Sequence, residues 1–135
     1  MASDAPQPSP DTTGPDTGGP DDPTTITSRF LTPTVAVVSP AGDVDTATAG
    51  PLRETIGEQV TAGAVHVVLD LSGVEFMGSA GLALLIAERE AAIAREGELR
   101  LAGVPRTAGR ALSLTGLTEL FDTYPDADAA AADLR

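Results

Sequence analysis

An almost continuously apolar run, VHVVLDL, occupies residues Val65 to Leu71 in the middle of the chain. Its β-branched residues favour a strand, and apolar residues on both faces are typical of a parallel strand that is covered on both sides. A short loop containing Gly78, Ser79 and Gly81 follows. Four aliphatic residues then recur at helical spacing, namely Leu82, Leu85, Ile86 and Ile93. This succession of strand, loop and helix predicts an α/β fold built around a central parallel strand.

The segments on either side of this unit also alternate between strand and helix patterns. Residues 26–32 and 34–39 are predicted to form an antiparallel hairpin around Pro33, and residues 51–62 a helix with Asp45 and Thr46 as candidate caps. The later predicted elements are a strand at 99–104, a helix at 107–114, a strand at 121–124 and a helix at 126–134. We therefore expect a mixed, mostly parallel sheet of about four to five strands with an antiparallel entry hairpin, packed with about four α-helices.

Residues 1–25 differ in composition from the rest of the chain. They are rich in Pro, Gly, Thr and Asp and contain no large apolar residue after Met1. Such a segment cannot bury enough surface to offset the entropy that is lost on ordering. We therefore predict a disordered acidic tail at residues 1–25 and one folded domain at residues 26–135.

The composition of the 135-residue chain excludes several kinds of chemistry. Because it has no cysteine, it can form no disulfide, thiolate metal site or cysteine nucleophile. All eight basic residues are arginine, so no lysine is present for a phosphate-binding P-loop or a Schiff base. We expect no metal and no cofactor.

Charge and hydropathy narrow the range of partners. A net charge of -12 with three Phe, one Tyr and no Trp opposes nucleic-acid binding, which needs a basic face or a stacking platform. No apolar run approaches the roughly 18 residues that span a bilayer, and the N-terminus lacks a secretory signal. We therefore expect a cytoplasmic protein that avoids membranes and binds a protein partner with some basic surface.

Ser79 lies where the predicted strand and loop give way to a predicted helix. Its hydroxyl is expected near the first N–H groups of that helix, where the helix dipole favours negative charge. Ser79 is therefore a candidate phosphoacceptor, and we expect Gly78 and Gly81 to leave the backbone open to approach. The other interpretation is that Ser79 only caps the helix, since Ser is among the commonest N-cap residues.

Two motifs carry a resemblance to a known family. DLSGVEFMGSAGLALLI, at residues 70–86, resembles the signature of bacterial STAS domains of the anti-sigma factor antagonist type, usually close to D-L-S-x-V-x-F-[ML]-D-S-[SA]-G-L. GDVDTATAGPLRE, at residues 42–54, is similar to the second family landmark, G-E-[LIV]-D-x-x-[ST]-A. The resemblance covers residues 26–135 and implies a STAS fold.

The resemblance implies a regulatory switch and not an enzyme. Family members bind an anti-sigma factor that is also an ATP-dependent serine kinase, which frees a sigma factor for RNA polymerase. The kinase phosphorylates the serine that matches Ser79, the complex dissociates, and a PP2C-type phosphatase reverses the modification. The matching residues predict a partner-binding surface of Asp43, Asp45, Met77, Gly78, Ser79, Ala80 and Gly81. The free protein is expected to be a monomer.

Gly78 departs from the family pattern, which often has Asp before the phosphoacceptor. A carboxylate that could orient the hydroxyl or contact the kinase is therefore absent. Other residues in and around this surface also fit purely structural roles. Asp45 fits an N-cap as well as a partner contact. Ser72 and Glu75 fit a role in shaping the loop, whereas the spacing of Leu82 and Leu85 predicts core positions.

The alternatives to the switch are a serine hydrolase, a dinucleotide-binding protein and a STAS adaptor. A serine hydrolase would need His66, the only histidine, as its base, but His66 belongs to the strand before the loop and Ser79 lacks a G-x-S-x-G elbow. His66 is therefore predicted to be a partly buried strand residue. The glycines of the loop do not reproduce the dinucleotide fingerprint G-x-G-x-x-G. A STAS adaptor of a signalling or transport assembly, which is never phosphorylated, is the nearer alternative.

Overall fold

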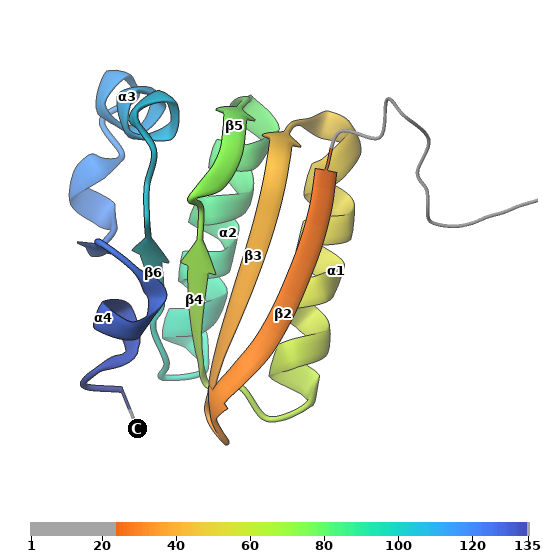
Figure 1. Cartoon of the computed structure of the whole chain (residues 1–135). Helices are drawn as coiled ribbons and strands as arrows, with labels where there is room; N and C mark the ends of the chain where they lie inside the picture. The colour runs from red at the N-terminus through yellow and green to blue at the C-terminus, as the bar shows by residue number, and fades with distance from the viewer. Residues whose placement is uncertain (1–23, 135) are drawn as a thin grey trace, which may run out of the picture.

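The computed structural model describes residues 24–134, which form one sheet with helices on both faces (Figure 1). The elements in chain order are β2 Thr24–Thr32, β3 Val35–Val44, α1 Thr46–Thr61, β4 His66–Asp70, β5 Gly73–Met77, α2 Ser79–Ala94, β6 Leu99–Ala102, α3 Arg106–Leu114, the 3₁₀ helix η2 Thr118–Leu120, β7 Thr123–Tyr124 and α4 Ala127–Ala131. The predicted tail lies outside the described residues, except for Thr24 and Thr25 in β2.

The strand order is β2-β3-β4-β6-β7, and β5 also pairs with β3. The hairpin strand β2 is antiparallel to β3, whereas the other strand pairs are parallel. β4 borders the first half of β3 through the pairs Val35↔His66 to Val38↔Leu69, and β5 borders its second half through Ala41↔Gly73 to Val44↔Met77. This arrangement confirms the predicted fold class, a mixed and mostly parallel sheet with an antiparallel entry hairpin, although the sheet that the described residues form has six strands and not the four to five expected.

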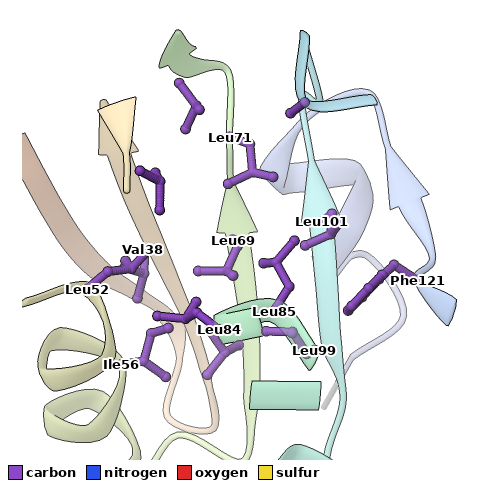
Figure 2. Packing of buried hydrophobic residues seen from close by; sticks show 14 of the residues in the cluster. Val38, Leu52, Ile56, Leu69, Leu71, Leu84, Leu85, Leu99, Leu101 and Phe121 are labelled. Carbon is purple, nitrogen blue, oxygen red and sulfur yellow. The ribbon is translucent and has the colours of Figure 1, made fainter. Parts of the chain in front are cut away.

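Two apolar clusters hold the layers together. The larger cluster lies between the sheet and the helices α1 and α2, where side chains such as Leu52, Leu69 and Leu84 converge (Figure 2). The smaller cluster lies on the opposite face, where Val35, Val37 and Val68 pack against α4 and Leu134. Burial on both faces explains why the central strands are almost entirely apolar.

Several predicted boundaries are wrong. Residues 73–77, expected to be part of the loop, form the strand β5, which takes the place of β4 beside the second half of β3 where β4 ends. Helix α1 begins at Thr46 and not at Pro51, because Asp45 caps it there. Pro51 lies inside the helix at an exposed position, where its missing N–H costs one hydrogen bond.

The predicted helical stripe of the segment after the loop is also partly wrong. The buried residues of α2 are Gly81, Leu84, Leu85 and Ala92, and Ile93 stands beside this stripe with 56% of its surface exposed. The remaining predicted elements are present, although β3 runs five residues further than expected, to Val44, and β6, β7 and α4 are shorter than expected. No helix within residues 24–134 has both the length and the apolar character to cross a bilayer.

Candidate functional site

The candidate site lies where β3 and β5 end and two helices begin. Val44 and Met77, the last residues of these strands, pair in parallel register. Asp45 then caps α1 and Gly78 caps α2, and the Gly78 N–H donates to the Val44 carbonyl oxygen at 2.9 Å. The parallel register therefore holds two helix amino termini, with their partial positive charges, at the same edge of the sheet.

Ser79 is the first residue of α2, and its side chain is exposed. Its N-cap is Gly78, which has an extended backbone (φ -85°, ψ -176°) and no side-chain cap, and the first turn contains no acidic residue. Ser79 Oγ makes no hydrogen bond to any other residue in the part of the chain that the structure describes. The interpretation of Ser79 as a helix cap is therefore wrong, and its hydroxyl is left available for another molecule.

Asp45 contrasts with Ser79 because its side chain is already used within the protein. Its Oδ1 accepts the N–H groups of Ala47 at 3.0 Å and Thr48 at 3.2 Å. The Asp45 N–H in turn donates to Thr48 Oγ1 at 2.8 Å, which completes a capping box. The interpretation of Asp45 as an N-cap is confirmed. Its contact with a partner stays a prediction, as does that of Asp43, whose backbone oxygen accepts from Thr48 Oγ1 at 2.8 Å.

The residues on either side of Ser79 differ in accessibility. Gly78 and Ala80 are partly exposed, whereas Met77 and Gly81 are buried. A Cβ atom on Gly81 would lie 2.9 Å from Met77 Cγ and 3.0 Å from Val44 Cγ1. Glycine at this position therefore lets α2 start close against β3 and β5. The expectation that Gly81 opens the backbone to approach is wrong, and the predicted partner-binding surface has Ser79 at its exposed centre.

Sequence reasoning missed Phe76, which is 54% exposed beside this surface. Strict strand alternation places Phe76 on the same face as the buried Val74, but the register of β5 against β3 shifts between Gly42 and Asp43. As a result both Glu75 and Phe76 are exposed. A Cβ atom on Gly78 would lie 3.3 Å from Cε2 of the Phe76 ring, so the ring lies directly against the backbone that precedes Ser79. The motif alone contains no signal for this exposure.

The predictions for Ser72 and for the core leucines are confirmed, whereas that for Glu75 is wrong. Ser72 donates from its N–H and its Oγ to Asp70 Oδ1, at 3.1 and 2.8 Å, which closes the turn after β4. Glu75 lies in the strand β5 and not in a loop, and its carbonyl oxygen accepts Thr107 Oγ1 at 3.3 Å, which links β5 to α3. Leu85 is buried, and Leu82 packs against the same cluster.

The geometry also rules out a hydrolase triad built on Ser79. His66 is a partly buried strand residue, as predicted, and its Nδ1 accepts the Glu98 N–H at 3.1 Å. His66 pairs with Val35 at the start of β3. Ser79 lies two residues after Met77, which pairs with Val44 at the end of β3. A ten-residue strand separates these positions by roughly 30 Å. Within residues 24–134, no three His, Asp or Glu side chains are grouped so that they could hold a metal ion.

Comparison with known proteins agrees with this fold. Residues 31–130 match the family model of the STAS domain. The chain therefore belongs to the STAS domain family, and the resemblance drawn from its two motifs is confirmed.

Several relatives are anti-sigma factor antagonists. The chain is 39% identical over 95 residues to the anti-sigma-F factor antagonist RsfB of Mycobacterium tuberculosis. The aligned region covers 69% of this chain and 78% of RsfB. The crystal structure of an anti-sigma factor antagonist from Mycobacterium paratuberculosis is similar with a TM-score of 0.74 and 34% identity, over 88% of this chain and 99% of that protein. Unphosphorylated SpoIIAA, at 17% identity and a TM-score of 0.69 over 80% of this chain and 95% of its own, shows the same fold.

Proposed function

We propose that the protein is an anti-sigma factor antagonist that binds an anti-sigma factor through the edge around Ser79 and releases it when Ser79 is phosphorylated. The observation that carries the proposal is the exposed Ser79 hydroxyl at the first position of α2, with no hydrogen bond to another described residue. The identity to RsfB, whose name gives it this activity toward an anti-sigma-F factor, supports the same role.

The start of α2 is suited to accept a phosphate. The first N–H groups of a helix lack acceptors within that helix and carry its partial positive charge. In α2 they meet neither a capping side chain nor an acidic residue in the first turn. The first N–H groups of α2 would therefore stabilise a phosphoryl group on Ser79 Oγ. The fold is expected to survive phosphorylation.

The same phosphate opposes a partner that packs over Ser79. It adds about two negative charges where a neutral hydroxyl had been in contact, and both desolvation and repulsion then act against binding. Asp43, Asp45 and Glu75 already make this edge acidic, so the bound surface of the partner is expected to be basic or neutral. In this proposal the partner is also the kinase that uses ATP, a PP2C-type phosphatase restores binding, and the switch works in the cytoplasm without catalysis by this chain.

The test combines binding with phosphorylation. The purified chain is titrated with the anti-sigma-F factor of Mycobacterium tuberculosis and with each kinase-type anti-sigma factor of its own source genome, first without nucleotide and then with Mg-ATP. We expect one of them to bind and to modify Ser79, as located by mass spectrometry. Ser79→Ala should keep binding and lose modification, and Ser79→Glu should weaken binding.

Other outcomes would contradict the proposal in distinct ways. Binding without modification, or with modification elsewhere, favours the STAS adaptor that is never phosphorylated. The observation that favours the adaptor is Gly78, because it puts no carboxylate before the serine. Equal binding by Ser79→Ala and Ser79→Glu would refute the charge mechanism. Absence of binding to every anti-sigma factor tested would refute the antagonist function.

A further inference from the structure

We propose that Phe76 is an apolar anchor for the anti-sigma factor, so that the contact extends from the start of α2 around the end of β5 onto the sheet face opposite α1 and α2. This inference rests on the proposed function and adds a residue and a surface to it.

Phe76 is the largest exposed side chain beside Ser79. More than half of its surface, 54%, is accessible, while Val74 and Met77 of the same strand are 4% and 6% exposed. An exposed aromatic ring forgoes the burial that stabilises folded proteins, and large apolar groups left on a surface often mark a contact with another molecule. Aromatic side chains are also enriched among interface residues.

The position of Phe76 in the sheet explains why no other element within residues 24–134 buries it. Phe76 pairs with Asp43, whereas the next residue, Val44, belongs to the cluster under α1 and α2. Because side chains alternate along β3, Asp43 and Phe76 lie on the opposite face. On that face α4 packs against β4, β6 and β7. Among the described elements, no helix lies over the end of β5 and the neighbouring part of β3 on this face, since α3 contacts β5 from the side of the larger cluster (Figure 1).

Phe76 and Ser79 belong to one continuous surface. The ring approaches to 3.3 Å from the position that a Cβ atom on Gly78 would take, so it lies against the residue that precedes Ser79. Since Gly78 has no side chain, nothing from that residue stands between the ring and the serine. A partner that packs closely over the exposed Ser79 hydroxyl therefore reaches the ring as well.

The surroundings of the ring define the chemistry of its occupant. Asp43 and Glu75 lie beside Phe76 on β3 and β5, and the whole chain carries a net charge of -12. A second copy of this chain would place the same carboxylates opposite each other across a symmetric contact, which is unfavourable. The occupant that fits is a protein surface with an apolar pocket bordered by basic side chains. We assign this occupant to the anti-sigma factor because Ser79 adjoins the ring.

The experiment uses the only other exposed phenylalanine of the described chain as a matched control. Phe30 is 39% exposed but pairs with Ala36, near the opposite end of β3. Phe76→Ala should weaken binding of the anti-sigma factor from the panel above by about tenfold or more, whereas Phe30→Ala should leave the dissociation constant within about twofold. Phe76→Leu should recover part of the loss.

A second measurement does not depend on how the variants fold. The chain contains three phenylalanines, so the parent protein labelled with 4-fluorophenylalanine gives three assignable fluorine signals. On addition of the anti-sigma factor, the Phe76 signal should shift and lose its response to a soluble paramagnetic probe. The Phe30 signal should not change, and Phe121, which is 6% exposed, serves as the buried reference.

The outcomes separate this inference from the proposed function. If the parent binds, Ser79→Glu weakens binding and Phe76 behaves like Phe30 in both assays, the anchor is refuted while the switch stands. If the parent binds no anti-sigma factor, both are refuted. If the fluorine signal of Phe76 in the parent does not change on binding, the anchor is refuted even if Phe76→Ala loses binding.

Discussion

The carbonyl oxygen of Val44 accepts the N–H of Gly78 at 2.9 Å, and this bond fastens the N-cap of α2 to the end of β3. Asp45, the residue after Val44, is the N-cap of α1, so the two helices start from adjacent positions. Asp45 satisfies the first N–H groups of α1 with its carboxylate, whereas Gly78 offers α2 no side chain. At this edge the first N–H groups of α1 are therefore bound by a side chain, whereas those of α2 can still bind an anion.

A negative charge at Ser79 should stabilise the protein while it weakens the complex. Ser79→Glu puts a carboxylate in the first turn of α2, where no acidic residue is present, and should raise the free energy of unfolding by about 0.3–1 kcal/mol. Urea unfolding measures this gain, which should shrink at high salt. Ser113→Glu, in the last turn of α3, is the control and should bring no gain. Destabilisation by Ser79→Glu would mean that its loss of binding reflects the fold and not the charge.

Two glycines in helices should respond oppositely to alanine. Nothing lies within 4 Å of a Cβ atom on Gly57 in α1, so Gly57→Ala should stabilise by about 0.5–1 kcal/mol through helix propensity. On Gly81, a Cβ atom would meet Met77 and Val44 at 3.0 Å or less. Overpacking costs about 1–3 kcal/mol and exceeds the propensity gain, so Gly81→Ala should destabilise. Thermal and urea unfolding compare the two, and a stabilised Gly81→Ala would contradict the packing role of Gly81.

Most strands and helices of the fold can be predicted from local hydrophobic patterns in the sequence, but β5 cannot. The apolar run of β4 and the helical stripe of α2 each bury enough side chains to predict a single element. The apolar residues of β5 are Val74, Phe76 and Met77, which form neither a continuous apolar run nor an alternation that extends over the whole strand. This strand exists because the second half of β3 needs a neighbour, and that requirement appears only once the chain is folded.

The candidate site also has features that the sequence predicts and others that it does not. The position of Ser79 at the start of a helix, and Asp45 as a cap, follow from residue type and spacing. The exposure of Phe76 depends instead on a register shift between β3 and β5, and one residue of shift exchanges the faces of a strand. Local sequence also cannot reveal that Gly78 and not Ser79 is the N-cap, because the choice depends on the bond from Gly78 to Val44.

Arg100 should be the polar residue on which the packing of α4 depends most. It is 5% exposed in β6, its Nη1 donates to the Ala130 carbonyl oxygen at 2.9 Å, and it pairs with Asp133 and Glu98. The hydrogen bond that Arg100 donates to the Asp133 carboxylate raises the pKa of Arg100, and the guanidinium lies 5.3 Å from the centre of the Tyr124 ring. Arg100→Ala should cost about 2–4 kcal/mol, because it leaves a cavity and frees α4.

Arg100→Met distinguishes packing from charge. It fills much of the same volume, and the side chains of Asp133 and Glu98 stay hydrated because they are 72% and 47% exposed. Its cost should therefore be smaller, about 1–2 kcal/mol. Arg110→Ala removes an exposed arginine of α3 as the control and should change stability by less than about 0.5 kcal/mol. Urea unfolding measures all three, and equal values for the variants at position 100 would indicate that charge dominates.

Glu88 should make the stability of the protein depend on pH. Burial raises the pKa of this half-buried carboxyl in α2, and the nearby Arg95 and Arg53, which lower it, do not offset that effect. A raised pKa means that the folded state binds the proton more tightly than the unfolded state. Ionisation of Glu88 therefore costs stability, a penalty that is absent below the unfolded pKa of about 4.3 and complete above the folded pKa. Glu88→Gln should be more stable than the parent at neutral pH, and the difference should vanish as the pH falls toward 4. Urea unfolding across this range checks it, with Glu90→Gln as the control for the loss of one charge from an exposed position of the same helix. A difference that is constant with pH would show that Glu88 destabilises the fold through its shape and not through its ionisation.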